Sequence, residues 1–288
     1  MSQANITIPV DLTNPGQFFA CCGLLELADR LWPGAEGWFD HDSFHLNAPD
    51  AACDLILQTI SESEITNTLT PEQIARREEF SKLESKDLTA AQKSEKGHLD
   101  KLHRELPIVL KGQVSFCIDW FRDKYSGGSR LKTWAGQQSI LTITQAMHKG
   151  IRVAGINSGN ELWKSVYDIG LPFYFDSDLG GQGSGIDIGF VFDALASNKA
   201  GQIKVSCKPA LEMLCFIGLQ RFRPFNLQEL NRFVYVAWNI PLSPSIASAA
   251  VNRSVPMTGA VFEFSLLYRT DYLKSFLPAQ PYKGDRDE

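Results

Sequence analysis

A chain of 288 residues, of which 44% are hydrophobic and 21% charged, has the composition of a globular protein and can bury a substantial core. Its formal net charge of −5 excludes a global basic field, so any nucleic-acid site has to be a local cationic patch. No charged opening segment precedes a long apolar one, and no run approaches ~18 apolar residues. We therefore expect a cytoplasmic protein with no membrane-spanning segment.

The stretch 11–39 is predicted to seed the fold as a strand, a buried helix and a further strand or hairpin. The turn at 14–16 contains Pro15, whose fixed φ and missing N–H suit the first turn of a helix. Apolar residues then recur at helical spacing around nearly the whole circumference, which is typical of a core helix. The run Trp32-Pro33-Gly34 predicts its end, and the flanking runs 5–12 and 37–46 resemble strands.

The cysteines lie mostly inside apolar runs, at positions 21, 22, 53, 117, 207 and 215. Two of them are adjacent in the predicted core helix, where they point in different directions. Cytosolic chemistry keeps thiols reduced, so we interpret them as buried free thiols. The lack of a CxxC pair argues against a structural zinc site, and we expect no metal and no cofactor.

A second amphipathic helix is predicted at 49–60, after which the composition changes sharply. The segment 61–105 is rich in Glu, Lys, Arg, Gln and Ser, with acids and bases nearly balanced, and is interpreted as an exposed helical hairpin or partly ordered insertion. Thr70 is the expected cap of its first helix, because Pro71 and Glu72 follow it. Gly97 is expected to interrupt its second helix.

Strands and helices alternate irregularly in the rest of the chain. Strands or hairpins are predicted at 107–121, 171–175, 186–192, 232–242 and 260–269, and helices at 139–150 and 209–219. The late strands look like antiparallel neighbours, which favours an α+β fold with a mixed, largely antiparallel sheet over a doubly wound parallel one. We expect one α+β domain at 1–280 with the charged helical insertion at about 61–105, and a disordered tail at 281–288.

The first candidate binding segment is the loop 122–138. Its cationic, aromatic and amide side chains are Arg122, Lys124, Tyr125, Arg130, Lys132, Trp134, Gln137 and Gln138. Cations neutralise phosphates, aromatic faces stack on unpaired bases, and the Gly127-Gly128 pair lets a ligand approach the backbone. The alternative is a surface loop that Trp134 anchors to the core, and the sequence alone leaves both open.

The second candidate is the run 220–224, in which Arg221 and Arg223 would project to the same side of an extended chain. They could bind a nucleic-acid backbone or an acidic partner. An internal ion pair with one of the chain's acids is an equally good interpretation.

Two further segments carry little chemistry. Asp176 and Asp178 begin a partial match to a calcium-binding loop, but its later ligands are missing and strands rather than helices are expected around it. Asp40, His41, Asp42 and His45 lie close together, at a spacing that is unspecific in a strand or turn. The nucleophile elbow, the zincin signature and the kinase set are absent, so we expect no enzyme.

Three runs resemble a known family: NPGQFFACCGLLELA at 14–28, LKTWAGQQ at 131–138 and GLQRFRP at 218–224. They look like a CRISPR-associated protein family of subtype I-G, formerly I-U, usually described as a small relative of the Cascade large subunit. The resemblance implies a non-catalytic subunit of an antiviral interference complex that contacts guide RNA and target DNA. Its implied partners are other Cascade subunits and a recruited helicase-nuclease. Many Cascade backbone subunits carry ferredoxin-like folds, and the predicted opening strand, helix and strand is compatible with such a fold.

RNA-guided recognition suits this chain, because base pairing reads the sequence while protein reads backbone and a short duplex motif. Such a subunit needs local cationic and aromatic loops rather than an overall positive charge. Two alternatives stay open. One is a guide-RNA-processing or other nuclease that uses the histidines and aspartates at 40–45 or the histidines at 98 and 103. The other is a purely structural subunit whose basic loops pair with acidic proteins.

Overall fold

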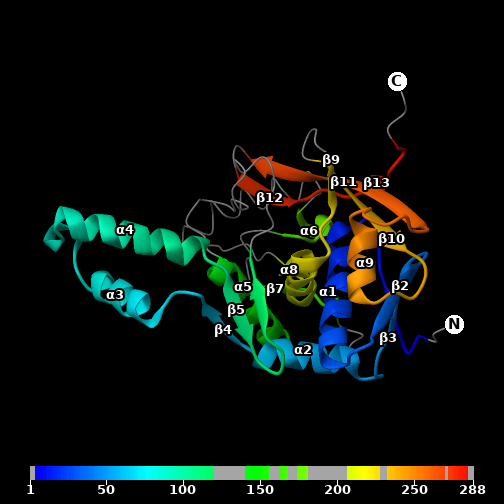
Figure 1. The fold of residues 1–288 in the computed structure, drawn as a ribbon, viewed down its shortest axis with the longest axis horizontal. Helices are drawn as coiled ribbons and strands as arrows, with labels where there is room; N and C mark the ends of the chain where they lie inside the picture. Colours follow the sequence, from blue (N-terminus) through cyan, green and yellow to red (C-terminus); the bar gives the residue numbers. More distant parts are fainter. Residues whose placement is uncertain are drawn as a thin grey trace.

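The computed structural model describes residues 4–119, 140–155, 162–167, 174–180, 206–227, 232–269 and 272–284. Within these ranges helices and antiparallel strand pairs share one main core, and the predicted α+β class is confirmed. Figure 1 shows a compact body from which one pair of helices projects.

The core is organised around two helices, α1 (Pro15–Leu31) and α8 (Pro209–Arg221), which pack along each other. Helix α1 begins and ends where the sequence predicts, because the Asn14 side chain caps its first turn and Trp32 follows its last. Almost every side chain of α1 and α8 is buried, as expected for helices that are apolar all round. The helices that surround this pair are α2 (Ala52–Glu62), α5 (Ile140–Ala154) and α9 (Pro244–Val251).

Three N-terminal strands form an antiparallel sheet in the order β1-β3-β2. They are β1 (Ile6–Pro9), β2 (Glu36–Asp40) and β3 (Ser43–Asn47). With α1 between β1 and β2, this is the order in which a ferredoxin-like domain begins. The next strand, β4 (Glu64–Asn67), pairs with β5 (Ile108–Lys111), so only the opening unit follows the ferredoxin-like order.

The C-terminal strands form a second antiparallel sheet, β12-β11-β10-β9, with β13 also on β11. They are β9 (Phe225–Leu227), β10 (Arg232–Trp238), β11 (Gly259–Arg269), β12 (Tyr272–Phe276) and β13 (Gln280–Pro281). Phe18 of α1 joins the two sheets, because its ring stacks on Phe39 of β2 at 4.9 Å and on Tyr235 of β10 at 4.3 Å. Trp238 Nε1 also donates to the carbonyl of Gly37 at 2.6 Å.

The charged insertion forms the expected helical hairpin, which projects from the body in Figure 1. Its helices are α3 (Pro71–Ser81) and α4 (Ala90–Glu105), with the short 3-10 turn η1 (Ser85–Asp87) between them. Thr70 caps α3 as predicted, in a reciprocal arrangement with Gln73. The expectation for Gly97 is wrong, because α4 runs through it without a break.

The remaining expectations fall partly outside the described residues. The hairpin at 107–121 is confirmed as β5 with β6 (Phe116–Ile118), and the helices at 139–150 and 209–219 are confirmed as α5 and α8. Of the strand expected at 171–175 only the last two residues are described, and 186–192 lies outside. Short elements nearby are α6 (Ser177–Gly180), β7 (Val166–Tyr167) and β8 (Ser206–Cys207). Pro281 and Tyr282 are expected in a disordered tail. In the structure Pro281 pairs with β11, and the backbone amide of Tyr282 donates a hydrogen bond to the same strand.

Candidate functional site

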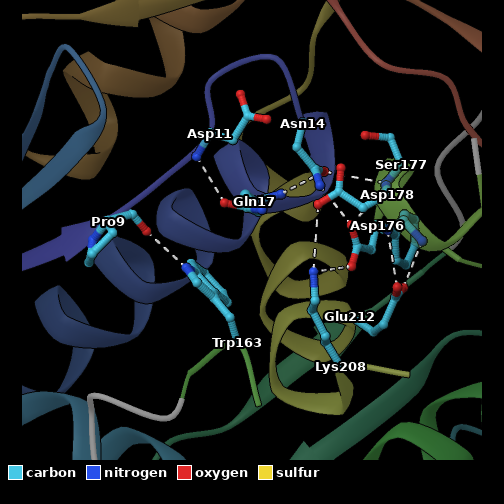
Figure 2. Close-up of polar contacts among 11 residues, drawn as sticks. Pro9, Asp11, Asn14, Gln17, Trp163, Asp176, Ser177, Asp178, Lys208 and Glu212 are labelled. Atoms are coloured by element: carbon cyan, nitrogen blue, oxygen red, sulfur yellow. Dashed lines mark hydrogen bonds and ion pairs between the residues drawn. The ribbon is translucent and has the colours of Figure 1, made fainter. Parts of the chain in front are cut away.

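The N-terminal ends of α1 and α8 meet in a buried polar cluster, drawn in Figure 2, that holds the segment 174–178. Asn14, the cap of α1, donates from Nδ2 to Asp176 Oδ1 at 2.6 Å and accepts from the Ser177 amide at 3.3 Å. Asn14, Asp176 and Ser177 are each almost fully buried. One asparagine therefore caps a helix and fixes a segment that is remote in sequence.

Two charged residues at the start of α8, its N-cap residue Lys208 and Glu212 of its first turn, complete this cluster. Lys208 Nζ lies 2.9 Å from Asp176 Oδ2 and 3.6 Å from Asp178 Oδ2. The Glu212 carboxylate accepts from the amides of Phe175 at 2.7 Å and Asp176 at 3.0 Å. The Lys208 ammonium thus lies between the carboxylates of the two aspartates.

Burial sets the electrostatics of the cluster. Desolvation, and next the charge of Asp176, raise the pKa of Glu212 to about 8, although two backbone N–H donors oppose the shift. Desolvation and then Asp176 also raise the pKa of Asp178. The cluster therefore takes up protons more readily than isolated carboxylates do. Apart from the buried Ser177 hydroxyl, which has no hydrogen-bond partner, its polar groups pair with one another across three parts of the chain, and the cluster is a clasp for the segment 174–178.

Sequence reasoning missed this clasp, although one signal was present. Glu212 stands alone in the apolar run PALEMLCFIGL, and an acid within a buried helix requires a partner. Asp176 attracted attention only through the calcium-loop comparison. Its carboxylate instead pairs with Lys208 and Asn14. No group of three or more His, Cys, Asp or Glu among the described residues could hold a metal ion.

The opposite ends of α1 and α8 share an ion-pair network. The buried carboxylate of Glu26 lies 2.8 Å from Arg30 Nε and 2.6 Å from Arg221 Nε. Arg221 also donates to Ser245 at 3.2 Å, and Arg30 lies over the ring of Phe116. Of the two interpretations left open for Arg221, the structure thus shows the internal ion pair.

Arg223, the other arginine of the second candidate segment, is exposed. Beside it, Gln220 ties this segment to the end of β6. Its Oε1 accepts from the Asp119 amide at 3.0 Å, and its Nε2 donates to the Asp119 carbonyl at 2.8 Å. Asp119 is the last described residue before the candidate loop 122–138. The end of β6, which precedes that loop in the sequence, therefore lies beside Gln220.

The loop itself lies outside the described residues. This applies to six of the predicted binding residues, Arg122, Lys124, Arg130, Lys132, Trp134 and Gln137. Among the described residues, the strand before the loop contacts Gln220, and helix α5, which follows the loop, packs on α8. The described segments that flank the loop, the end of β6 and helix α5, thus both contact the helix that carries Arg221.

The histidine and aspartate group at 40–45 forms the β2–β3 hairpin. His41 adopts a positive φ of 48° at its turn, whereas His45 stacks on Trp38 and contacts Thr7. The two histidine rings thus have different surroundings, since His45 contacts Trp38 and Thr7 whereas His41 lies at the turn. The six cysteines are all free thiols, five of them buried as predicted, and Cys117 is exposed.

None of the helices that the structure describes is long and apolar enough to cross a bilayer. No protein-family model matches the chain, and comparisons with curated proteins and with solved structures find no match either.

Proposed function

We propose that this chain is a non-catalytic nucleic-acid-binding subunit of a type I-G CRISPR interference complex, in which it contacts guide RNA, target DNA or both. Two arguments support the proposal. The first is the resemblance of the runs 14–28, 131–138 and 218–224 to that family. The second is the bidentate contact of Gln220 with Asp119, which joins the strand that precedes the cationic loop to the helix end that precedes Arg223.

This contact carries the proposal because it joins the end of β6 to the end of α8, two segments that are far apart in the sequence. A phosphate backbone is bound by several cations along a path, and each cation adds its own contribution. The loop contributes Arg122, Lys124, Arg130 and Lys132, and the run 220–224 contributes Arg223. The proposal assigns the phosphate contacts to these cations on an otherwise acidic protein.

Arg221 has a different role in this proposal. Its Nε is bound to Glu26, and its side chain keeps 38% exposure. The ion pair with Glu26 and the hydrogen bond to Ser245 hold the guanidinium against the body of the protein. Substitution of Arg221 would disturb the core as well as the surface, and Arg223 is therefore the better residue for a binding test.

The experiment is an electrophoretic mobility shift of target DNA with the guide-loaded complex. We expect Arg223→Glu and Lys132→Glu each to weaken target binding or assembly. Lys93→Glu is the matched control, because it makes the same charge change as Lys132→Glu at an exposed position of the projecting helix α4. Unchanged assembly and binding in both test variants would refute the site assignment.

Salt dependence separates direct phosphate contact from a purely structural role. Each phosphate contact contributes roughly 0.7–0.9 to the slope of log affinity against log salt concentration. Wild-type complex should therefore show a steeper slope than the Arg223→Glu complex, by about one contact. A purely structural subunit would give the same slope for target binding in both.

A further inference from the structure

A groove lies next to the connection between β1 and α1. It has a volume of about 540 Å³, and its described lining includes Val10, Asp11, Asp42, Trp163 and Phe262. The lining comes from four separate places in the chain: the β1–α1 connection, the β2–β3 turn, the segment 162–167 and β11. Such a convergence makes one surface out of residues that the sequence disperses.

The aromatic wall of the groove is held in place by a hydrogen bond. Trp163 Nε1 donates to the carbonyl of Pro9 at 2.9 Å. This bond uses the only donor of the indole, so the partly exposed ring offers an apolar face to the groove. Figure 2 shows Trp163 beneath the β1–α1 connection.

Among its described lining residues the groove has two aspartates and one histidine, His41. Asp11 and Asp42 are exposed, and no lysine or arginine lies with them. One oxygen of Asp11 is engaged by Thr13, whose amide and hydroxyl donate to Oδ1 at 2.8 and 2.7 Å. In Figure 2 its carboxylate points away from the buried cluster at Asp176. The backbone turn thus holds this acid in a fixed direction.

We propose that the groove binds an arginine side chain of a partner polypeptide. A guanidinium stacks on an indole face and donates two parallel hydrogen bonds to a carboxylate, and the groove offers both an indole and carboxylates. The acidic lining opposes nucleic acid, so this surface is distinct from the proposed nucleic-acid patch. The inference stands whether or not the chain binds nucleic acid.

The test uses the peptide acetyl-Leu-Arg-Leu-amide and its counterpart in which citrulline replaces arginine. Citrulline keeps the shape of the side chain and removes its charge. Binding is followed through the indole N–H resonance of Trp163 in a heteronuclear NMR titration of the full chain, assigned with Trp163→Phe. We expect the arginine peptide to shift this resonance in a saturable manner and to bind several-fold more tightly than the citrulline peptide.

Two conservative variants locate the charge. Asp11→Asn keeps an acceptor for Thr13, and Asp42→Asn changes an exposed turn residue, so both variants retain the fold. Each should weaken arginine-peptide binding about threefold, as expected for one exposed ion pair. Asp50→Asn, outside the groove lining, should change nothing. The proposal is overturned if the two peptides bind equally, if neither shifts Trp163, or if both groove variants bind as wild type does.

Discussion

Arg221 Nε lies 2.6 Å from the Oε2 of Glu26, so the last residue of α8 neutralises a buried acid of α1. Arg30, one turn after Glu26 on α1, binds the other carboxylate oxygen at 2.8 Å. Glu26 is only 3% exposed, whereas both guanidinium groups remain partly in solvent. Two half-exposed arginines thus make one buried charge tolerable, which is how buried ions generally persist.

The two neighbouring arginines should therefore differ in their effect on stability. Arg221→Ala leaves Glu26 with Arg30 alone, and we expect the free energy of unfolding to fall by about 1–3 kcal/mol. Arg223→Ala removes an exposed side chain and should change it by less than about 0.5 kcal/mol. Urea denaturation followed by far-UV circular dichroism measures both. Equal losses in the two variants would contradict the different roles assigned to them.

The crossing of α1 and α8 predicts a strong steric effect. A Cβ on Gly23 would clash with the Leu214 carbonyl oxygen, and one on Gly218 would clash with that of Phe19. Because the obstacles are backbone atoms of buried helices, they cannot move aside as a side chain does. Gly23→Ala and Gly218→Ala should each lower the free energy of unfolding by about 2 kcal/mol.

Gly97→Ala is the matched control for these two variants. Gly97 also lies within a helix, but nothing is near the position of an added Cβ. Alanine there should stabilise α4 by about 0.5–1 kcal/mol, because glycine is a poor helix former. If the core variants were as stable as wild type, the close helix contact would be wrong.

Local sequence patterns predicted α1 and α8 because their signals are local: a proline at the first turn and apolar residues all round. The same patterns predicted the β5–β6 hairpin and the capped start of α3. What they could not predict is the pairing of α1 with α8. The need for glycine at positions 23 and 218 is visible only when both helices are placed together. At each position a Cβ would clash with the backbone of the other helix.

The misses also have physical causes. Gly97 was expected to interrupt a helix, but its propensity cost is small compared with the contacts that α4 makes with α3. The strand β4 lies at the start of a polar segment, whose residues do not indicate a strand. It is stabilised by its pairing with β5. Within the second candidate segment, the pattern could not distinguish Arg221 from Arg223. That difference depends on Glu26, which is distant in sequence.

The projecting hairpin should unfold separately from the body. Phe80, Leu88 and Leu99 form a small cluster of their own, apart from the main core. Phe80→Ala should remove most of this cluster and cost the hairpin about 3–5 kcal/mol, more than a small unit can lose. Hydrogen exchange with mass spectrometry should then show lost protection across 71–105.

The body provides the internal control for this variant. Amides of α1 and α8 should keep their wild-type protection, because no member of the Phe80 cluster belongs to the main core. Loss of protection throughout the chain would mean that hairpin and body unfold as one unit.

The buried clasp predicts an unusual dependence of stability on pH. Desolvation, followed by the charge of Asp176, raises the pKa of Glu212 from its ordinary 4.5 to about 8 in the folded chain. The folded state therefore binds a proton that the unfolded state releases, and this contribution is fully present below pH 4.5 and is lost as pH rises towards 8. The loss can reach about 1.4 kcal/mol per pH unit.

Glu212→Gln isolates this contribution, because glutamine does not titrate. The variant should be less stable in acid, since one amide oxygen replaces two carboxyl oxygens that accept from Phe175 and Asp176. Its deficit relative to wild type should shrink between about pH 5 and about pH 8, as wild type loses its proton-linked stability. The opposing effect of His148, whose pKa is lowered first by desolvation, is common to both proteins and cancels in the comparison. Urea denaturation across this range measures the deficit, and a deficit that stays constant or grows with pH would show that Glu212 is ionised in the folded chain.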